Sequence, residues 1–550
     1  MRKGAFLFLL LTVALSPKNI FSQTPKTPKV EGRAIWIHPT ADLQDMASVK
    51  SLVANCKKAN INLIIPCMKL YGKVLWDSKK FSGAIPDDFK KKFEQGFDPL
   101  KELIAESHKN GIRVHAWLCD FTDEANLPAY KEHPEWAMLN KDGKPTTSEF
   151  LTNNTPYFIL WMCPAQRKGY TDQWLIPMIE EIVTNYDVDG IHHDYIRYPG
   201  DVSPDGYCFC DYCLENFLKY NHLYYECKPD TQIEAVQKLP IWISNWSQDN
   251  TIKPANWNKM TRAEKVDFIF KGSSMKGGPS DLDYFYYEYR CDQITKFARE
   301  AWEAAHKIKP NIQFSAAVFK NPALSGRNIG QRWTDFAPYV DIVMPMAYKS
   351  HFAGDLPTFQ KFLGEYTRYS NKWCEGVTNI SMGIDIAYIY GDIGKPIYEM
   401  RKSLKNMKEK KTDEMEAIQK NFKEIHKNLV KVAPALDKEI SAGIKNLAEK
   451  DTIKLNQVID SLDAKVAILL TNAPKGFYPE EILTSTIKAV RDGGGKGLVV
   501  FCAYDVTRCN LWDALAKSFN EPSIDQDLAN PVKGVNINTV RELEKLQKSK

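Results

Sequence analysis

The residues that point most directly to chemistry end one apolar segment near the middle of the chain, in D-G-I-H-H-D-Y-I-R-Y-P at 189–199. A tight turn at Gly190 leads into a predicted strand whose far end is polar. Asp194, with an arginine and histidines nearby, can act as an acid, a base or a nucleophile, because burial and neighbouring cations move the pKa of a carboxyl group in either direction. The alternative interpretation is a buried structural ion pair between Asp194 and Arg197.

Strand periodicity divides this segment between two faces. Successive side chains of a strand point to opposite sides, so His192 is expected on the same face as Asp194. Tyr195 and Arg197 are expected on the other face.

The elements that must position Asp194 alternate regularly along the chain. Predicted strands cover 33–39, 62–69, 113–118, 190–198, 313–319, 341–348, 380–389 and 497–504. Predicted helices cover 42–59, 99–110, 171–186, 283–307, 329–338, 356–370 and 480–492. Strands that alternate with helices imply parallel strands with helical crossovers. Eight such units over this length predict an α/β fold, a (β/α)8 TIM barrel, rather than an open sheet.

In such a barrel the C-terminal ends of the strands open into the active site. This rule selects further candidates for substrate binding, which lie at or near predicted strand ends: Trp36, His38, Tyr71, His115, Trp117, His192, Arg197, Tyr348 and Tyr504. Aromatic rings at this rim can stack on a ligand, while histidine and arginine can donate hydrogen bonds to it. About half of the set is expected to be core packing, because inward-facing aromatic side chains also fill barrels.

Three cysteines form a C-x-C-x-x-C motif after the fourth predicted strand: Cys208, Cys210 and Cys213. Three soft ligands this close together can hold a structural zinc ion, with a fourth ligand from Cys227, His222 or a distant residue. A disulfide is the competing interpretation in an oxidising compartment. Catalytic zinc is not expected, since these thiolates would close the site. No cofactor is expected for catalysis.

The ends and the insertions define the remaining organisation. Residues 1–22 have a basic start and a short apolar run, as a cleaved secretory signal does, and predict a periplasmic or extracellular protein. The barrel domain is expected over 31–520, with a Cys- and aromatic-rich loop insertion at 200–282 after strand 4. A helical hairpin is expected at 395–463 after strand 7, because apolar residues recur there at spacings of three and four. Residues 521–550 are expected to form a tail.

The charge distribution and the lengths of the apolar segments bear on two classes of partner, nucleic acids and membranes. The net charge is only +5, and the excess lysine is spread over a helical segment and the tail, which does not predict nucleic-acid binding. After the predicted signal no segment is long and apolar enough to cross a bilayer. The sequence does not predict an oligomeric state.

Several longer segments resemble the glycosyl-hydrolase-like family ten of TIM-barrel proteins, whose members include bacterial envelope enzymes that cut the glycan strands of peptidoglycan. The matching pieces are EGRAIWIHPT at 31–40, FDPLKELIAESHKNGIRVHAWL at 97–118, HPEWAMLNKDGK at 133–144, YDVDGIHHDYIRYP at 186–199, YEYRCDQITKFAREAWEAAHKIKP at 287–310 and MPMAY at 344–348. The resemblance implies a secreted glycoside hydrolase acting on a polysaccharide, with Asp194 at the position of the family's carboxylate. Many members carry two adjacent acids there, whereas this chain has Asp194-Tyr195.

Glycoside hydrolysis usually needs two carboxylates that flank the bond. The second must therefore come from another strand end, and the candidates are Asp120, Asp385 and Asp505. Asp385 is the first choice for a catalytic role because it lies in G-I-D, where the seventh strand should open into the cleft. With Asp385 in the catalytic role, Asp120 is expected to bind the substrate.

Two other functions compete with hydrolysis. A catalytically weak or inactive barrel that binds glycans is compatible with Tyr195 in place of a second acid. A metal-dependent carbohydrate deacetylase would need a His/Asp cluster, and no H-x-x-x-H pair lies near a strand end. Serine hydrolase chemistry lacks its G-x-S-x-G elbow.

Overall fold

The computed structural model describes residues 29–152, 155–200, 207–217, 256–271, 281–352, 356–386, 480–508 and 511–529, with Gly354 and a few isolated positions between 438 and 465. The predicted signal (1–22), most of both predicted insertions (200–282 and 395–463) and residues 530–550 lie outside the described residues. No helix within the described ranges combines the length and the apolar character that crossing a bilayer requires.

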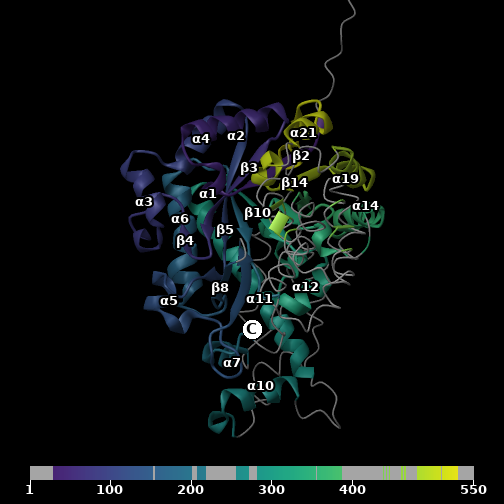
Figure 1. Cartoon of the computed structure of the whole chain (residues 1–550). Coiled ribbons are helices and arrows are strands. Elements are labelled where there is room, and N and C mark those ends of the chain that lie inside the picture. The colour runs from purple at the N-terminus through teal and green to yellow at the C-terminus, as the bar shows by residue number, and fades with distance from the viewer. Residues whose placement is uncertain are drawn as a thin grey trace, which may run out of the picture.

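Eight parallel strands form a closed barrel, as predicted (Figure 1). In chain order they are β2 (Gly32–Ile37), β3 (Leu63–Leu70), β5 (Arg113–Cys119), β9 (Gly190–Asp194), β10 (Gln313–Val318), β11 (Ile342–Pro345), β12 (Asn379–Ile380) with β13 (Met382–Asp385), and β14 (Gly497–Phe501). The seventh strand is interrupted at Ser381, so that β12 pairs with β11 and β13 pairs with β14. A bridge between Met346 and Gly383 completes the ring.

Helices cover the outside of the barrel where the alternating pattern predicts them: α2 (Met46–Lys58), α4 (Pro99–Lys109), α6 (Ile176–Asn185), α11 (Asp281–Ile308), α14 (Leu356–Trp373) and α19 (Glu480–Asp492). Two helices were not predicted, α1 (Pro39–Asp42) and α21 (Trp512–Ser518). Asp98 caps α4, its carboxylate accepting the backbone N–H of Leu100 at 3.0 Å. The helix predicted at 329–338 forms only in its second half, and its predicted start is wrong. Gly330 has φ +65° and ends α12 (Pro322–Ile329), after which α13 (Trp333–Phe336) and a 3-10 turn (Ala337–Tyr339) follow.

Shorter helices and strands lie at the two ends of the barrel. They are α3 (Asp87–Glu94), α5 (Pro128–Glu132), α7 (Asp211–Phe217), α10 (Arg262–Phe270), α20 (Ala503–Arg508), α22 (Gln526–Ala529), β1 (Lys29–Val30), β4 (Lys73–Val74) and β15 (Ser523–Ile524). The segment after β5, for which no strand is predicted, contains an antiparallel sheet of β6 (Thr122–Asp123), β7 (Thr147–Thr152) and β8 (Thr155–Trp161). This sheet lies beside the C-terminal ends of the barrel strands, since β6 directly follows β5.

The opposite end of the barrel is closed by residues that the sequence analysis assigned to the tail. β15 pairs with β1. The guanidinium of Arg113, on β5, bonds the buried carboxylates of Asp525 at 2.5 Å and of Asp527 at 2.8 Å. The packed part of the chain therefore extends past residue 520, to Ala529.

Candidate active site

A cavity of about 320 Å³ opens at the C-terminal ends of the barrel strands. Its walls are mostly aromatic and come from seven of the eight strands or the turns after them: Trp36, His38, Leu70, Tyr71, Trp117, Cys119, Asp194, Tyr195, Arg197, Ala317, Phe319, Met346, Tyr348, His351 and Phe501. Seven residues predicted from sequence are among them, namely Trp36, His38, Tyr71, Trp117, Asp194, Arg197 and Tyr348. Concave sites with an apolar lining and few polar groups are typical of small-molecule and saccharide binding.

Asp194 is the last residue of β9 and is 9% exposed. Its Oδ1 accepts the backbone N–H of Tyr195 at 2.6 Å, and its backbone carbonyl accepts the N–H of Asp120 on the neighbouring strand at 2.8 Å. Burial raises the pKa of the Asp194 carboxyl to about 6, against the lowering effects of the Tyr195 N–H and of Arg197. The group therefore titrates close to neutral pH.

Strand alternation predicted Tyr195 on the face opposite Asp194. This prediction is wrong, because Tyr195 lies in the cavity wall. Its φ of +51° turns the chain directly after Asp194, so the period of two ends there. Tyr71 has a φ of +47° at the end of β3, and its hydroxyl lies 3.3 Å from the Tyr195 hydroxyl. The two phenol hydroxyls therefore add a pair of polar atoms to the wall that contains Asp194.

Arg197 is held by aromatic rings and by the backbone. Its guanidinium carbon lies 5.0 Å from the ring centre of Trp161, 4.7 Å from that of Tyr195 and 5.0 Å from that of Phe319. One Nη donates to the carbonyl of Tyr198 at 3.0 Å. Among the described residues no ion pair joins Arg197 to Asp194, so the structural ion pair considered from the sequence is not formed.

His192 and His115 lie beneath the cavity and not in its wall. Both are fully buried, and both place Nδ1 near Oγ of Ser315, at 2.8 Å for His192 and 2.9 Å for His115. Burial lowers the pKa of His192 well below its usual value and that of His115 to about 4. These neutral imidazoles support the floor of the site, which corrects their prediction as substrate-binding residues.

Asp120 and Tyr504 also lie outside the cavity. The Asp120 carboxylate is fully buried and pairs with Nδ1 of His193 at 2.9 Å, on the side of the sheet where His193 packs against Phe297 of α11. Tyr504 is 46% exposed on α20, because the eighth strand ends at Phe501 and not at 504. Phe501 occupies the wall position that the sequence analysis gave to Tyr504.

Asp385 is the last residue of β13 and is buried beside the cavity without lining it. Its Oδ1 accepts the backbone N–H of Lys349 at 3.0 Å. Burial raises the pKa of the Tyr348 hydroxyl, and the carboxylates of Asp385 and Asp194 raise it further. The two carboxylates therefore both disfavour ionisation of the Tyr348 hydroxyl.

Sequence reasoning missed several wall residues, chiefly Tyr195, Phe319, His351 and Phe501. Phe319 ends the predicted strand at 313–319, so the strand-end rule could have selected it, whereas His351 lies beyond the end of β11, in the turn Lys349–His351. Tyr195 gave no such signal, because its left-handed backbone cannot be read from the sequence.

A second cavity of about 320 Å³ adjoins the first. Arg197 and Phe319 belong to the walls of both, and Trp161, Lys320, Asn321 and Leu324 are among the other residues of the second.

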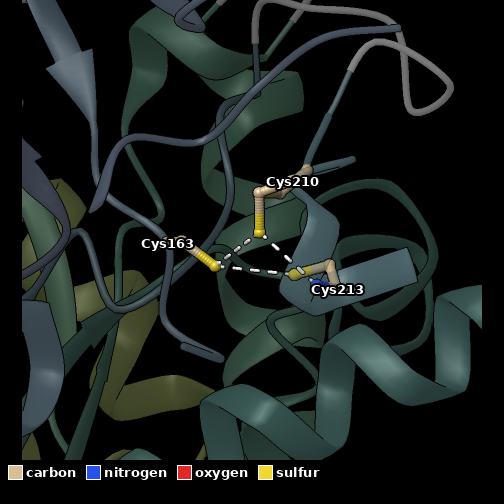
Figure 2. A group of neighbouring side chains, drawn as sticks. Cys163, Cys210 and Cys213 are labelled. Carbon is tan, nitrogen blue, oxygen red and sulfur yellow. Dashed lines mark hydrogen bonds between the residues drawn. The ribbon is translucent and has the colours of Figure 1, made fainter. Parts of the chain in front are cut away.

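A group of four cysteines is the one cluster of His, Cys, Asp or Glu side chains in the described ranges that could share a metal ion. Cys163 joins the predicted Cys208, Cys210 and Cys213. Figure 2 shows three of the four, Cys163, Cys210 and Cys213. The other fourth ligands considered, His222 and Cys227, lie outside the described residues.

The barrel, with a carboxyl group at the end of its fourth strand and an aromatic cavity around it, has the architecture of a glycoside hydrolase. The family model described as "Glycosyl hydrolase-like 10" matches residues 31–405, and the chain belongs to this family, as its sequence resemblance predicted.

Relatives and solved structures with similarity to the chain bear related names. "Glycosyl hydrolase DigH" of Escherichia coli strain K12 is 25% identical over 234 residues, which are 39% of this chain and 46% of DigH. "Glycosyl hydrolase YngK" of Bacillus subtilis strain 168 is 29% identical over 116 residues, 19% of each chain. The chain thus spans less than half the length of these curated relatives. The PgaB (BpsB) glycoside hydrolase domain from Bordetella bronchiseptica has a TM-score of 0.49 at 10% identity, with 89% of this chain and 99% of that chain covered.

Proposed function

We propose that this protein is a glycoside hydrolase that cleaves a polysaccharide, with Asp194 as the general acid. The observation that carries the proposal is a carboxyl group with a pKa raised to about 6 in the wall of an aromatic cavity at the strand ends. A carboxylic acid with such a pKa keeps its proton at mildly acidic pH and can transfer it to the leaving oxygen of a glycosidic bond. The indole and phenol rings around it supply flat apolar surfaces for sugar rings.

A polymeric substrate is favoured over a single sugar. The two adjoining cavities share Arg197 and Phe319, so a chain of sugars can occupy both while the bond to be cut lies near Asp194. The guanidinium of Arg197 faces this junction and suits a hydroxyl-rich or carboxylate-bearing sugar.

Asp385 is the proposed second carboxylate. It ends the seventh strand at the same rim as Asp194, and both groups influence Tyr348. A nucleophile would lie about 5 Å from the acid, whereas a base that activates water would lie about 6.5–9.5 Å from it. In either role the carboxylate must release the N–H of Lys349 or use its second oxygen.

The proposed substrate is the glycan strand of peptidoglycan, and the proposed compartment is the periplasm or the extracellular space. Support for the substrate comes from the resemblance to envelope hydrolases of the family. Support for the compartment comes from the basic and apolar N-terminal residues.

The direct test is a screen of the purified protein against peptidoglycan, with and without its stem peptides, beside a panel of plant and host glycans. Release of new reducing ends by the native protein, and not by Asp194→Asn, is the expected result. A panel in which no glycan is cut, or in which the variant cuts as fast as the native protein, would contradict the proposal.

A glycan-binding barrel without hydrolase activity is the second candidate. Asp194 is the one carboxylate among the described residues that line the cavity, and Tyr195 follows it where many family members have an acid. This candidate predicts saturable glycan binding without any product. A metal-dependent deacetylase finds less support, because the one possible metal cluster in the described ranges consists of cysteines away from the cavity wall.

A further inference from the structure

Four cysteine side chains converge at the end of the barrel that carries the cavity. Cys163 follows β8, and Cys208 and Cys210 lie in the turn before α7. Cys213 lies in the first turn of α7, and Figure 2 shows its side chain with those of Cys163 and Cys210. Their sulfur atoms all lie within 4.8 Å of one another, with 3.8 Å between Cys163 and Cys210 and 3.5 Å between Cys163 and Cys213. All four side chains are buried.

This spacing fits a metal ion at the centre of the group. Zinc binds thiolate sulfur at about 2.3 Å in tetrahedral sites, which places the sulfur atoms about 3.8 Å apart. We propose that Cys163, Cys208, Cys210 and Cys213 bind one structural Zn²⁺ ion. The site is closed by four protein ligands and leaves no position for a substrate, so its role is structural and not catalytic.

The surroundings suit a buried thiolate cluster. The backbone N–H of Cys213 points at the sulfur of Cys210, 3.4 Å away, and such donors stabilise negative charge on sulfur. Neighbouring segments also hold this loop, since the N–H of Phe209 donates to the carbonyl of Leu139 at 2.7 Å and the guanidinium of Arg262 on α10 donates to the carbonyl of Phe209 at 2.6 Å. Both bonds are made by the residue between Cys208 and Cys210.

Disulfide bonds explain this arrangement less well. Two disulfides would require each sulfur atom to lie near one partner sulfur only. Here the sulfur of Cys163 lies near those of both Cys210 and Cys213. A central ion accounts for the convergence of all four on one point.

The ion would brace one wall of the candidate active site. It would connect the chain after β8 to the turn that follows β9 and Asp194. Trp161, two residues before Cys163, stacks on Arg197 and contributes to the second cavity. Fixing Cys163 to α7 would therefore fix the position of the ring on which Arg197 rests.

The test is metal analysis of the full-length protein, purified without added metal and without a metal-affinity column. We expect about one zinc per chain in the native protein and in the control Cys374→Ala, which removes a buried thiol elsewhere in the fold. We expect at least a tenfold lower zinc content in Cys163→Ala and in Cys210→Ala. Zinc retained in full by Cys163→Ala would overturn the four-ligand site, and so would native protein without zinc.

Two measurements on the native protein keep the test decisive if the cysteine variants do not fold. Replacement of the zinc by Co²⁺ should give the intense visible absorption of a tetrahedral thiolate site. Alkylation under denaturing conditions with a chelator, but without a reductant, should modify all four cysteines, as read by peptide mass spectrometry. Four unmodified cysteines joined in two disulfides would overturn the proposal.

Discussion

The indole N–H of Trp36 donates a hydrogen bond to Nε2 of His192 across 3.0 Å, and this contact fixes the tautomer of the histidine. An indole has no acceptor, so Nε2 must carry the lone pair and Nδ1 the proton. Nδ1 then donates to Oγ of Ser315 at 2.8 Å, which leaves the Ser315 proton for Nδ1 of His115 at 2.9 Å. A directed chain of hydrogen bonds therefore runs from the cavity wall into the barrel.

Ser315→Ala should destabilise the protein because it leaves two buried imidazole nitrogens without this partner. We expect a loss of about 1–3 kcal/mol in the free energy of unfolding, measured by denaturant titration. Ser518→Ala, which removes a hydroxyl from the partly exposed end of α21, is the matched control and should change stability by less than about 0.5 kcal/mol. Equal effects of the two substitutions would show that the hydrogen bonds of Ser315 contribute nothing to the free energy of unfolding.

His115 should make the protein less stable as the pH falls. Its pKa is about 4 in the folded protein and 6.5 when unperturbed, so between these values the unfolded chain binds a proton that the folded chain does not. Stability should fall by up to about 3 kcal/mol from pH 6.5 to pH 4 through this group alone. His115→Gln should reduce this pH dependence in denaturant titrations across that range. An unchanged slope would contradict the buried neutral imidazole.

Arg197→Lys should weaken binding of the glycan at the junction of the two cavities. Lysine keeps the charge but cannot stack a planar group on Trp161 and Phe319 at once. A loss of about 1–2 kcal/mol, the range of such stacking contacts, corresponds to a rise in KM of about 5- to 30-fold. Steady-state kinetics on the best glycan of the screen should show this rise with a smaller change in kcat. A change confined to kcat would place Arg197 in the chemical step instead.

The barrel and its rim could be predicted from sequence because eight strand patterns alternate with helix patterns and because the C-terminal ends of parallel strands lie on one side of a barrel. How far below the rim each candidate side chain lies could not be predicted. His115 is paired in register with Gly190, four residues before Asp194, so it lies well below the rim although it belongs to a rim-reaching strand. His192 lies only two residues before Asp194 but points at Trp36 and Ser315.

Two other features depend on contacts that are distant in sequence or on backbone geometry. Cys163 lies 47 residues before Cys210, and no local motif connects it to the C-x-C-x-x-C sequence. Tyr195 enters the cavity because of a positive φ, which is uncommon for a tyrosine and has no signature in the residues around it. Phe501 takes the place in the cavity wall that was predicted for Tyr504, because the eighth strand ends three residues earlier than its apolar pattern.

The last prediction concerns Asp194→Asn, which should abolish hydrolysis and leave the fold intact. Asn keeps the size of Asp and can still accept the N–H of Tyr195, but it carries no acidic proton. The rate on the best glycan should fall at least ~10²-fold, the low end for general acid–base catalysis. Glycan binding should persist, because ring stacking does not depend on this charge. The activity of the native protein should fall as the pH rises above about 6, where Asp194 loses its proton.

The stability of the same variant separates catalysis from structure. The pKa of Asp194 is raised from 3.8 to about 6, so the folded protein resists its ionisation, and stability is lost as the pH rises between these values. At pH 7.5 Asp194→Asn should therefore unfold at the same or a higher temperature, with a gain of up to about 3 kcal/mol that is absent near pH 4. A sharp fall in melting temperature would instead indicate a structural carboxylate. Retained activity would place the chemistry elsewhere, and Asp385→Asn would be the next variant to assay.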